Sequence, residues 1–422
     1  MNRGVKIRFD VHNILYDIYK FNKVLDNHGI RKKIADNAPK DVSFINNLTL
    51  NSMRYQFHSR KIINKYIRKK LKIHEEILLI SAITQIVYLD FKEYAVVDCS
   101  VEIAKKINMY HGLANSFLKK ISRDKKELKK TKITFNDLPN WFLNYSSDLS
   151  SRDKKIFIEN FYKEPDLHMV FKNSKKLTQF EEKIQKTTDK SGYLLSDKKI
   201  SDIKSYKKGF WWIQDFSSFF PINNLEWINE NDKCLDMCAA PGGKSFQLLS
   251  TQAKVTLNDI NKSRLKILNE NLKRLNFKTK VLNKDYQMLD SKEKYSLIIV
   301  DAPCSAIGTI RKNPEIFFKN SEPDINKLLY LQEKLLDKAS DLLIENGLIV
   351  YMVCSFLKVE TLDQINKFIK KYKNFRISNF QTSSQNNYYA EIIKYKFMRT
   401  LPNILNGKTI DGYFAAYIRK IK

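Results

Sequence analysis

The sequence predicts an α/β protein in which a mostly parallel sheet, covered by helices on both faces, follows an all-helical domain. From about Gly209 onward, short β-rich runs alternate with helical stretches, which is typical of parallel sheets. Before about residue 130, glycine is scarce and apolar residues recur at helical spacing. The expected domains are a helical domain at 1–132, a small α/β connecting region at 133–208 and the α/β domain at 209–422.

Length and charge are consistent with this division. A chain of 422 residues exceeds one typical core, so two or three domains are expected. The chain has 75 Lys and Arg against 46 Asp and Glu, a net charge of +29. Such a field favours a polyanion, with nucleic acid as the leading candidate. The alternative is compositional, because the chain is rich in Lys, Asn and Ile, as an AT-rich coding sequence would make it.

The cysteines and the apolar runs indicate the compartment. The five cysteines form an odd, sparse set without a C-x-x-C pair, which argues against a disulfide framework and against zinc. No run of about 18 apolar residues and no signal peptide is visible. We therefore expect a cytoplasmic, monomeric protein with reduced thiols, no metal and no membrane partner.

Three apolar runs predict helices in the first domain, at 74–90, 94–107 and 112–121. The stretch 54–72 is basic, and aromatic residues interleave with its charges, which suits a surface for phosphates and bases. Taken alone, this stretch is better explained as an amphipathic helix with a solvated charged face. Residues 119–132 are charge-rich and are expected to end a helix and begin a linker.

Strands and helices alternate in order through the last domain. The expected strands are 233–238, 254–259, 279–285, 295–303 and 347–355, and the expected helices are 242–249, 262–275 and 324–345. The C-terminal segments 388–402 and 411–421 are expected to form a hairpin-like ending. In open α/β sheets, ligands bind where the strands end.

A turn and two acids at these strand ends predict a ligand site. Small residues and glycines at 235–244 let the backbone approach a ligand, and the following helix points its N–H groups at it. Asp259 ends the second strand, where a carboxylate can accept hydrogen bonds from two ribose hydroxyls. Asp285 ends the third strand and could accept from an adenine amino group. For Asp259 alone, a strand-end cap is an equal alternative.

The segments CLDMCAAPGGKS, LNDIN, NKDY, DAPCSAIGTIRKNPEI and VYMVCS together resemble the motifs of the RNA cytosine-C5 methyltransferase family. The resemblance extends to GFWWIQDFSS, MRTLP and DGYFAAYIRK and covers about half of the chain. It implies a Rossmann-like class I methyltransferase domain with a mostly parallel seven-stranded sheet that binds S-adenosyl-L-methionine. The implied cofactor-binding residues are Cys238, Ala239, Ala240, Pro241, Gly242, Gly243, Lys244, Asp259, Asp285 and Asp301.

Two cysteines follow adjacent strands, and either could be a nucleophile by chemistry. A thiolate that adds to C6 of cytosine makes C5 nucleophilic, and the C5 proton must later leave. Cys304 follows Asp-Ala-Pro, and DNA cytosine methyltransferases use a Pro-Cys thiol as nucleophile. In the RNA family that this chain resembles, the strand-end Cys-Ser thiol attacks, which implies Cys354 as nucleophile and Cys304 as the helper in product release. Asp301 is then expected to contact the base edge.

Each cysteine considered singly is better explained as a small buried apolar residue, and we expect this of Cys99 and Cys234. The chain also departs from the family pattern at two places. Met352-Val353 stands where Ser-Thr is usual, and Ser305-Ala306 stands where Ser-Gly is usual. Both departures keep the reactive atoms but are expected to alter the loop backbone.

The helical domain resembles the antitermination-factor (NusB-like) RNA-binding domain at ILLISAITQIVYLDFKEYAVVDCSVEIAKKI and HGLANSFLKKI. Among bacterial RNA cytosine-C5 methyltransferases, this pairing implies a small-subunit (16S) ribosomal RNA substrate whose target cytosine is turned out of its stack. A transfer-RNA substrate, a purely structural role for the domain and a catalytically weak RNA-binding assembly factor remain alternatives.

Overall fold

The computed structural model describes residues 2–25, 28–196, 200–203, 205–380, 392–394 and 396–421. By spatial proximity the chain divides into two compact units. The first contains Met1–Lys163 and Ile310–Glu322, and the second contains Glu164–Thr309 and Pro323–Lys422. The expected connecting region at 133–208 is therefore divided between the units, because its first part is helical and packs with the N-terminal helices.

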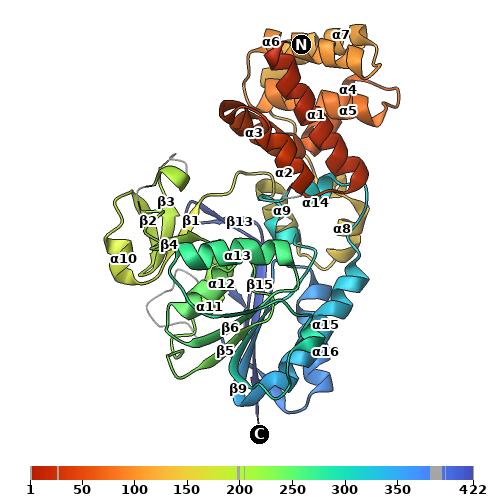
Figure 1. The fold of residues 1–422 in the computed structure, drawn as a ribbon. Helices are drawn as coiled ribbons and strands as arrows, with labels where there is room; N and C mark the ends of the chain where they lie inside the picture. Colours follow the sequence, from red (N-terminus) through yellow and green to blue (C-terminus); the bar gives the residue numbers. More distant parts are fainter. Residues whose placement is uncertain are drawn as a thin grey trace. The chain divides into compact units, whose positions relative to one another are not determined.

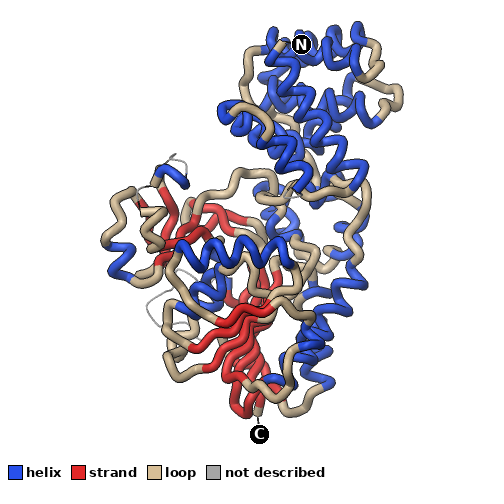
Figure 2. Tube along the Cα trace, in the orientation of Figure 1, coloured by secondary structure: helices blue, strands red, loops and turns tan. Residues whose placement is uncertain are grey.

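The first unit is helical throughout its described residues (Figures 1 and 2). Its elements are α1 (Arg3–Phe21), α2 (His28–Ala35), α3 (Pro39–Arg54), α4 (Gln56–Tyr66), α5 (Ile73–Ile83), the π-helical turn η1 (Thr84–Tyr88), α6 (Glu93–Lys106), α7 (His111–Leu128), the 3₁₀ turn η2 (Phe135–Asp137), α8 (Asn140–Tyr145), α9 (Ser151–Asn160) and α14 (Glu315–Phe318). The three helices expected from apolar spacing are confirmed as α5 with η1, α6 and α7. Their apolar residues share one core, in which Ile80, Ile103 and Leu118 are fully buried.

One segment of the first unit comes from far along the chain. Residues 310–322 directly follow the loop that contains Cys304, yet they pack among the N-terminal helices. Phe317 and Phe318 are both buried, and the ring of Phe317 lies 5.2 Å from that of Phe142. Arg54, itself buried, donates from Nε and Nη2 to the carbonyl of Arg311 at 3.2 and 2.9 Å. Adjacent aromatic rings need an apolar cover, and the helices supply it.

The second unit begins with a small antiparallel sheet in the order β2-β3-β1-β4. Its elements are β1 (His168–Phe171), α10 (Ser174–Thr178), β2 (Ile184–Thr188), β3 (Ser191–Leu194), the 3₁₀ turn η3 (Ile200–Asp202) and β4 (Trp211–Ile213). His168 fixes this sheet to the chain that follows, since its Nδ1 lies 2.7 Å from the carbonyl of Gln214. Asp166, just before β1, accepts from the backbone of Thr409 at 2.8 Å.

The large sheet has the order β11-β12-β15-β9-β8-β5-β6-β7, and β10 also pairs with β15. Its strands are β5 (Lys233–Asp236), β6 (Lys254–Asn258), β7 (Lys280–Leu282), β8 (Tyr295–Asp301), β9 (Leu343–Val353), β10 (Phe375–Ser378), β11 (Ile393–Lys394), β12 (Phe397–Thr400) and β15 (Tyr413–Lys420), with a separate pair β13 (Asn403–Leu405) and β14 (Lys408–Ile410). The strands β7, β6, β5, β8 and β9 are parallel, as expected. The sheet has nine strands rather than the expected seven, because β12 and the two-residue β11 extend the edge at β15.

Helices cover both faces of this sheet (Figure 1). One face packs on α11 (Phe216–Asn223), α12 (Gly243–Leu249) and α13 (Lys262–Arg274), and the other on α15 (Ile325–Leu342) and α16 (Leu362–Lys371). Alternate residues of β8 face opposite cores: Ile299 belongs to the first cluster, whereas Ile298 belongs to the second. Both are fully buried, so β8 reads as a continuous apolar run.

The C-terminal ending is antiparallel, as expected, where the structure describes it: β12 and β15 pair from Phe397 opposite Ala416 to Thr400 opposite Tyr413. Part of the expected hairpin, residues 381–391, lies outside the described residues. Within the described ranges, no helix is both long and apolar enough to cross a bilayer, and no cluster of three or more His, Cys, Asp or Glu side chains could hold a metal ion.

Candidate active site

The structure places the predicted site residues along one edge of the large sheet, in the order of its parallel strands. Asp285 follows β7, Asp259 follows β6, and the turn 237–242 follows β5. Asp301 ends β8, and Cys354 follows β9. Parallel strands bring all these positions to the carboxyl edge, where ligands bind in open α/β sheets.

The turn after β5 leads into α12 through a residue that must be glycine. Gly242 has φ +118°, and a Cβ there would lie 2.1 Å from the ring of Phe246. Beneath the turn, Asp236 is fully buried and accepts from Ser245 Oγ at 2.7 Å. Burial raises the pKa of this carboxyl to about 7.

Asp259 is held in one orientation by the backbone around it. Its Oδ2 accepts from the N–H of Ala240 at 3.1 Å, and its Oδ1 accepts from the N–H of Asn261 at 2.8 Å. Arg264 lies 3.8 Å from the carboxylate and also donates to the carbonyl of Ala240. These contacts fix the carboxylate of Asp259 to the turn after β5, as either a capping or a ligand-binding role requires.

Asp285 is half-buried, and its Oδ1 accepts from the N–H of Gln287 at 2.9 Å. Together with Asp236, Asp259 and Asp301 it makes four carboxyl side chains along this edge, in a chain with a net charge of +29. These hydrogen-bond acceptors fit a ligand that carries hydroxyl and amino donors together with a positive charge, as S-adenosyl-L-methionine does.

The carboxylate of Asp301 is bound on both oxygens. Lys244 Nζ lies 2.6 Å from Oδ2, and the hydroxyl of Tyr413 donates to Oδ1 at 2.7 Å. The ammonium of Lys244 also lies over the ring of Tyr413, 5.4 Å from its centre. Burial raises the pKa of Tyr413, and the neighbouring Asp301 adds to this effect, so the phenol stays a hydrogen-bond donor.

The two predicted reactive cysteines are neighbours. The sulfur atoms of Cys304 and Cys354 lie 3.4 Å apart, and both side chains are half-buried. The hydrogen bond with Cys354 raises the pKa of the Cys304 thiol, and burial adds to it. By contrast, Cys99 and Cys234 are buried, as expected.

The two departures from the family pattern differ in their effect on the backbone. Met352 and Val353 are fully buried in β9 and continue its regular pairing with β15. Ala306, in the loop after Cys304, has φ +57°, a left-handed conformation that glycine adopts without a steric cost. The methyl group of Ala306 therefore adds strain beside Cys304.

Two residues of this site were not predicted from the sequence. Tyr413 had no reactive motif around it, although it is the first residue of a β-rich run next to Gly412. Glu360 is completely buried and accepts from both the N–H and the hydroxyl of Ser305, at 2.8 and 2.6 Å. Its only signal is a single acid in the short apolar stretch after Cys354.

In the basic stretch 54–72, fewer charged and aromatic side chains are available to a ligand than the composition suggested. Arg60, Lys61 and Lys65 form ion pairs with Glu76, Asp137 and Glu127, at 2.6, 2.8 and 3.1 Å. The ring of Tyr55 stacks on that of Tyr88, and Phe57 is buried. The charged residues of this stretch left exposed without a carboxylate ion pair in the described ranges are Arg68, Lys69, Lys70 and Lys72.

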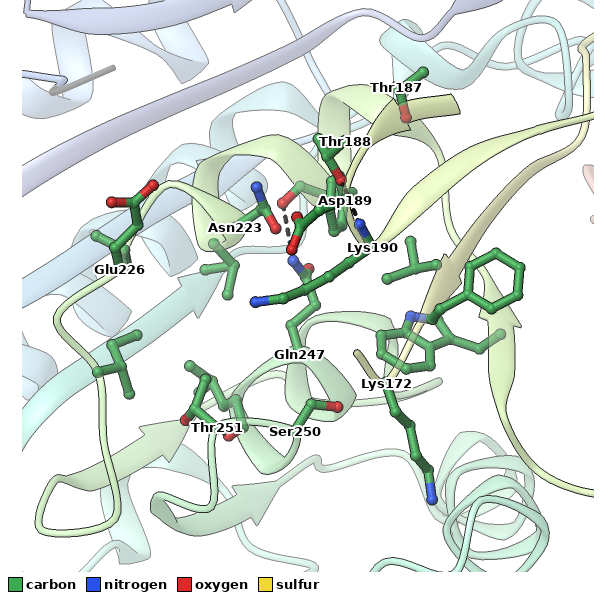
Figure 3. Close-up of a pocket in the computed structure, with 18 of the residues that line it drawn as sticks. Lys172, Thr187, Thr188, Asp189, Lys190, Asn223, Glu226, Gln247, Ser250 and Thr251 are labelled. Carbon is green, nitrogen blue, oxygen red and sulfur yellow. Dashed lines mark hydrogen bonds between the residues drawn. The ribbon is translucent and has the colours of Figure 1, made fainter. Parts of the chain in front are cut away.

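A cavity of about 990 Å³ lies elsewhere in the second unit (Figure 3). Residues of the small sheet, including Lys190, and of α11 and α12, including Asn223 and Gln247, line it. None of the predicted site residues does, so this cavity is separate from the cysteine pair.

Known proteins resemble this chain over both units. Residues 225–419 match a family described as 16S rRNA methyltransferase RsmB/F, and residues 6–123 match the NusB family. A relative from Photorhabdus laumondii named ribosomal RNA small subunit methyltransferase B is 27% identical, with 94% of this chain and 96% of the relative covered. A relative of the same name from Pasteurella multocida is also 27% identical, with 87% and 85% covered.

Solved structures show the same fold. The crystal structure of PH0851 superposes with a TM-score of 0.71 at 19% identity, covering 100% of this chain and 99% of the other. The structure of NSun6 from Pyrococcus horikoshii with SFG has a TM-score of 0.56 at 19% identity, covering 67% and 98%.

Proposed function

We propose that this chain, which carries a NusB-family domain followed by a methyltransferase domain of the RsmB/F family, methylates C5 of a cytosine in small-subunit ribosomal RNA. The observation that carries the proposal is the pair of half-buried thiols, 3.4 Å apart, in the loops that follow β8, which ends in Asp301, and β9. The names of the relatives support ribosomal RNA of the small subunit as the substrate.

The cofactor is S-adenosyl-L-methionine, which supplies the electrophilic methyl group. The turn 238–244 would hold it through the open N–H groups at the start of α12. Asp259 and Asp285 would accept hydrogen bonds from its hydroxyl and amino groups. The carboxylates along the sheet edge complement its positive charge.

Methylation of C5 requires that a nucleophile first add to C6, because cytosine C5 is a poor nucleophile by itself. We assign this addition to the sulfur of Cys354, which forms a bond to C6 as electron density moves to N3. The proton that the Cys354 thiol loses passes through solvent to N3, so the N3 and N4 edge then presents donors to a carboxylate. Asp301, held by Lys244 and Tyr413, would accept from that edge.

The covalent bond to Cys354 must break after methyl transfer, when solvent water accepts the proton at C5, the C5–C6 double bond re-forms and the sulfur of Cys354 leaves as a thiolate. Cys304 is assigned as the residue that assists this elimination. Its sulfur lies 3.4 Å from that of Cys354, and the raised pKa of its thiol favours the protonated form. The thiol of Cys304 would therefore donate a hydrogen bond to the departing thiolate of Cys354.

The direct test incubates the purified full-length protein with methyl-labelled S-adenosyl-L-methionine and either small-subunit ribosomal RNA or transfer RNA. The proposal expects label in the ribosomal RNA, at a cytosine that resists bisulfite conversion, and no label with a Cys354→Ala variant. Label confined to transfer RNA would move the substrate to that class. Label on a base other than cytosine would refute the cysteine mechanism.

A further inference from the structure

Glu360 is a fully buried carboxylate in the 3₁₀ turn η6 (Lys358–Glu360), six residues after Cys354. Its two oxygens receive the N–H and the hydroxyl of Ser305, at 2.8 and 2.6 Å. Burying a carboxylate is costly unless hydrogen bonds compensate for the lost water. Here both principal bonds go to one residue, the direct neighbour of Cys304.

A second buried side chain binds the other neighbour of Cys304. Gln332, in α15, donates from Nε2 to the carbonyl of Pro303 at 3.0 Å and lies 3.3 Å from Glu360 Oε1. Like Glu360, it is completely buried. Pro303 is therefore bound by Gln332 and Ser305 by Glu360, and these two side chains contact each other.

The loop that carries Cys354 is joined to this network as well. The hydroxyl of Ser355 lies 3.4 Å from that of Ser305, and it accepts from the N–H of Leu357 at 3.2 Å. The Cys-Ser pairs of the two loops therefore meet twice, sulfur to sulfur and hydroxyl to hydroxyl, with the same separation of 3.4 Å.

The groups that bind Glu360 are neutral. Its described hydrogen-bond partners are the N–H and hydroxyl of Ser305 and the amide of Gln332. The hydrogen bond with Cys354 and burial raise the pKa of the Cys304 thiol, and the negative charge of Glu360 adds to this effect. A side chain that only filled the core would not need a charge. Glu360, in contrast, places a buried negative charge near a reactive sulfur.

We propose that Glu360 is a positioning residue for Cys304: through Ser305 it fixes the Cys304 sulfur against the Cys354 sulfur. The role of this sulfur–sulfur contact rests on the proposed function. The contact itself can be measured without RNA or cofactor. Glu360 touches neither the base nor the methyl donor in this scheme.

The first measurement uses diamide, a thiol oxidant, which removes the hydrogens of two thiols and is reduced to the hydrazine as the disulfide forms. The rate of Cys304–Cys354 disulfide formation reports how well the sulfurs are held together. Glu360→Ala should slow it about tenfold, the worth of one buried hydrogen bond to a charged group. Glu360→Gln keeps an acceptor for the Ser305 N–H and should restore most of the rate. Asp363→Ala, which removes an exposed carboxylate nearby, should leave the rate unchanged.

The second measurement follows alkylation of Cys304 by iodoacetamide against pH in a Cys354→Ala background, and the labelled Cys304 peptide is quantified by mass spectrometry because Cys238 is also half-buried. Adding Glu360→Gln should move the curve to lower pH, because a neighbouring negative charge is lost. A purely structural role would leave the curve in place, since the amide preserves the fold.

The proposal is overturned if Glu360→Ala folds like the parent and forms the disulfide at the parental rate, or if the alkylation curve does not move. Should Glu360→Ala fail to fold, Ser305→Ala decides, because it removes the hydroxyl bonds to Glu360 and Ser355 and keeps the backbone bond to Glu360. An unchanged disulfide rate in that variant would also overturn the proposal. Neither measurement uses methyl transfer, so failure of the proposed function would leave both readable.

Discussion

The sulfur atoms of Cys304 and Cys354 lie 3.4 Å apart at the ends of two neighbouring parallel strands. Two thiolates at this distance would repel each other, so the pair favours one ionised and one protonated sulfur. The hydrogen bond with Cys354, burial and the charge of Glu360 all raise the pKa of the Cys304 thiol and favour its protonated form. A protonated Cys304 agrees with the proposed assignment of Cys354 as the sulfur that attacks.

Separate substitution of the two cysteines should give different products. Cys354→Ala should abolish methylation, because no group remains to add to C6 of the base. Cys304→Ala should lower turnover by about 10²- to 10⁴-fold, the range for a lost acid–base group, and accumulate a covalent enzyme–RNA adduct. Denaturing gels with labelled RNA would show the adduct as a slower band.

The thiol Cys99, in the helical unit, provides the control for cysteine loss, since Cys99→Ala should neither stop turnover nor trap RNA. An adduct that needs Cys304 and forms without Cys354 would reverse the assignment of the two roles.

Tyr413→Phe should weaken catalysis more than cofactor binding. It removes the 2.7 Å hydrogen bond to Asp301 and keeps the ring beneath Lys244. We expect kcat to fall about tenfold, equivalent to about 1.4 kcal/mol, with little change in the KM for the methyl donor. Tyr417→Phe is the matched control on the same strand, because its hydroxyl bonds to the carbonyl of Pro221 instead. Equal losses of kcat in both variants would count against a role through Asp301.

Ala306→Gly should stabilise the protein. Ala306 has φ +57°, where an L-residue costs about 1–2 kcal/mol, whereas the extra freedom of glycine in the unfolded chain costs about 0.4–1 kcal/mol. The net gain should be about 0.5–1 kcal/mol in the unfolding free energy measured with urea. Asn346→Gly is the control, because asparagine already tolerates its φ of +58°. A destabilised Ala306→Gly variant would show that the methyl group makes a favourable contact.

The alternation of strands and helices along the chain, and the edge of the sheet where the predicted site residues lie, could be predicted from the sequence because both follow from local patterns. Apolar periodicity located the helix 262–275, now α13, and the strand-end motifs placed Asp259, Asp301 and Cys354 on one edge. Because the strands are parallel, their carboxyl ends lie at one edge of the sheet, and these three residues come together there.

Long-range partners could not be predicted in this way. Tyr413 reaches Asp301 across 112 residues, and Phe317 packs among helices of the first unit although its neighbours in sequence carry the site. The helical stretch 140–160 showed no clear periodicity because aromatic rings dominate its packing. Such contacts depend on tertiary packing, which a single sequence does not encode locally.

Acid should destabilise the helical unit before carboxylates titrate. Burial lowers the pKa of both His12 and His58 to about 4, from 6.5 in an unfolded chain. Below pH 6.5 the unfolded chain therefore binds protons that the folded unit excludes, and stability falls as pH drops from 6.5 to 4. The loss should reach about 1.4 kcal/mol per pH unit for each histidine. Hydrogen exchange of peptides from α3 and α4 between pH 7 and 5 would measure it.

His58→Gln should remove the contribution of that histidine and lower the slope of stability against pH by up to about 1.4 kcal/mol per pH unit, whatever it does to stability at pH 7. His111→Gln, at an exposed position in α7, should leave the slope unchanged. A slope that persists undiminished in His58→Gln would mean that other groups cause the acid sensitivity.

The exposed cluster Arg68, Lys69 and Lys70 should contribute to RNA affinity through phosphate contacts. Arg60, Lys61 and Lys65 are paired with carboxylates and Arg54 is buried, so this cluster and the neighbouring Lys72 are what remains for a polyanion. A triple Ala variant should bind ribosomal RNA about 10- to 100-fold more weakly and lower the salt dependence of log K by about 2, since each lost phosphate contact removes about 0.7–0.9. These surface changes are preferable to deleting 1–130, because Phe317 and Phe318 pack against those helices and would be exposed.

The same charge can be removed elsewhere in the first unit as a control. Lys92, Lys105 and Lys106 are exposed at α6, and their triple Ala variant removes an equal charge of three. If affinity depends on the cluster, this control should change the salt slope by less than half as much. Equal changes in the two variants would mean that only net charge matters. Binding of S-adenosyl-L-methionine, measured by calorimetry, should be the same in the parent protein and in both triple variants.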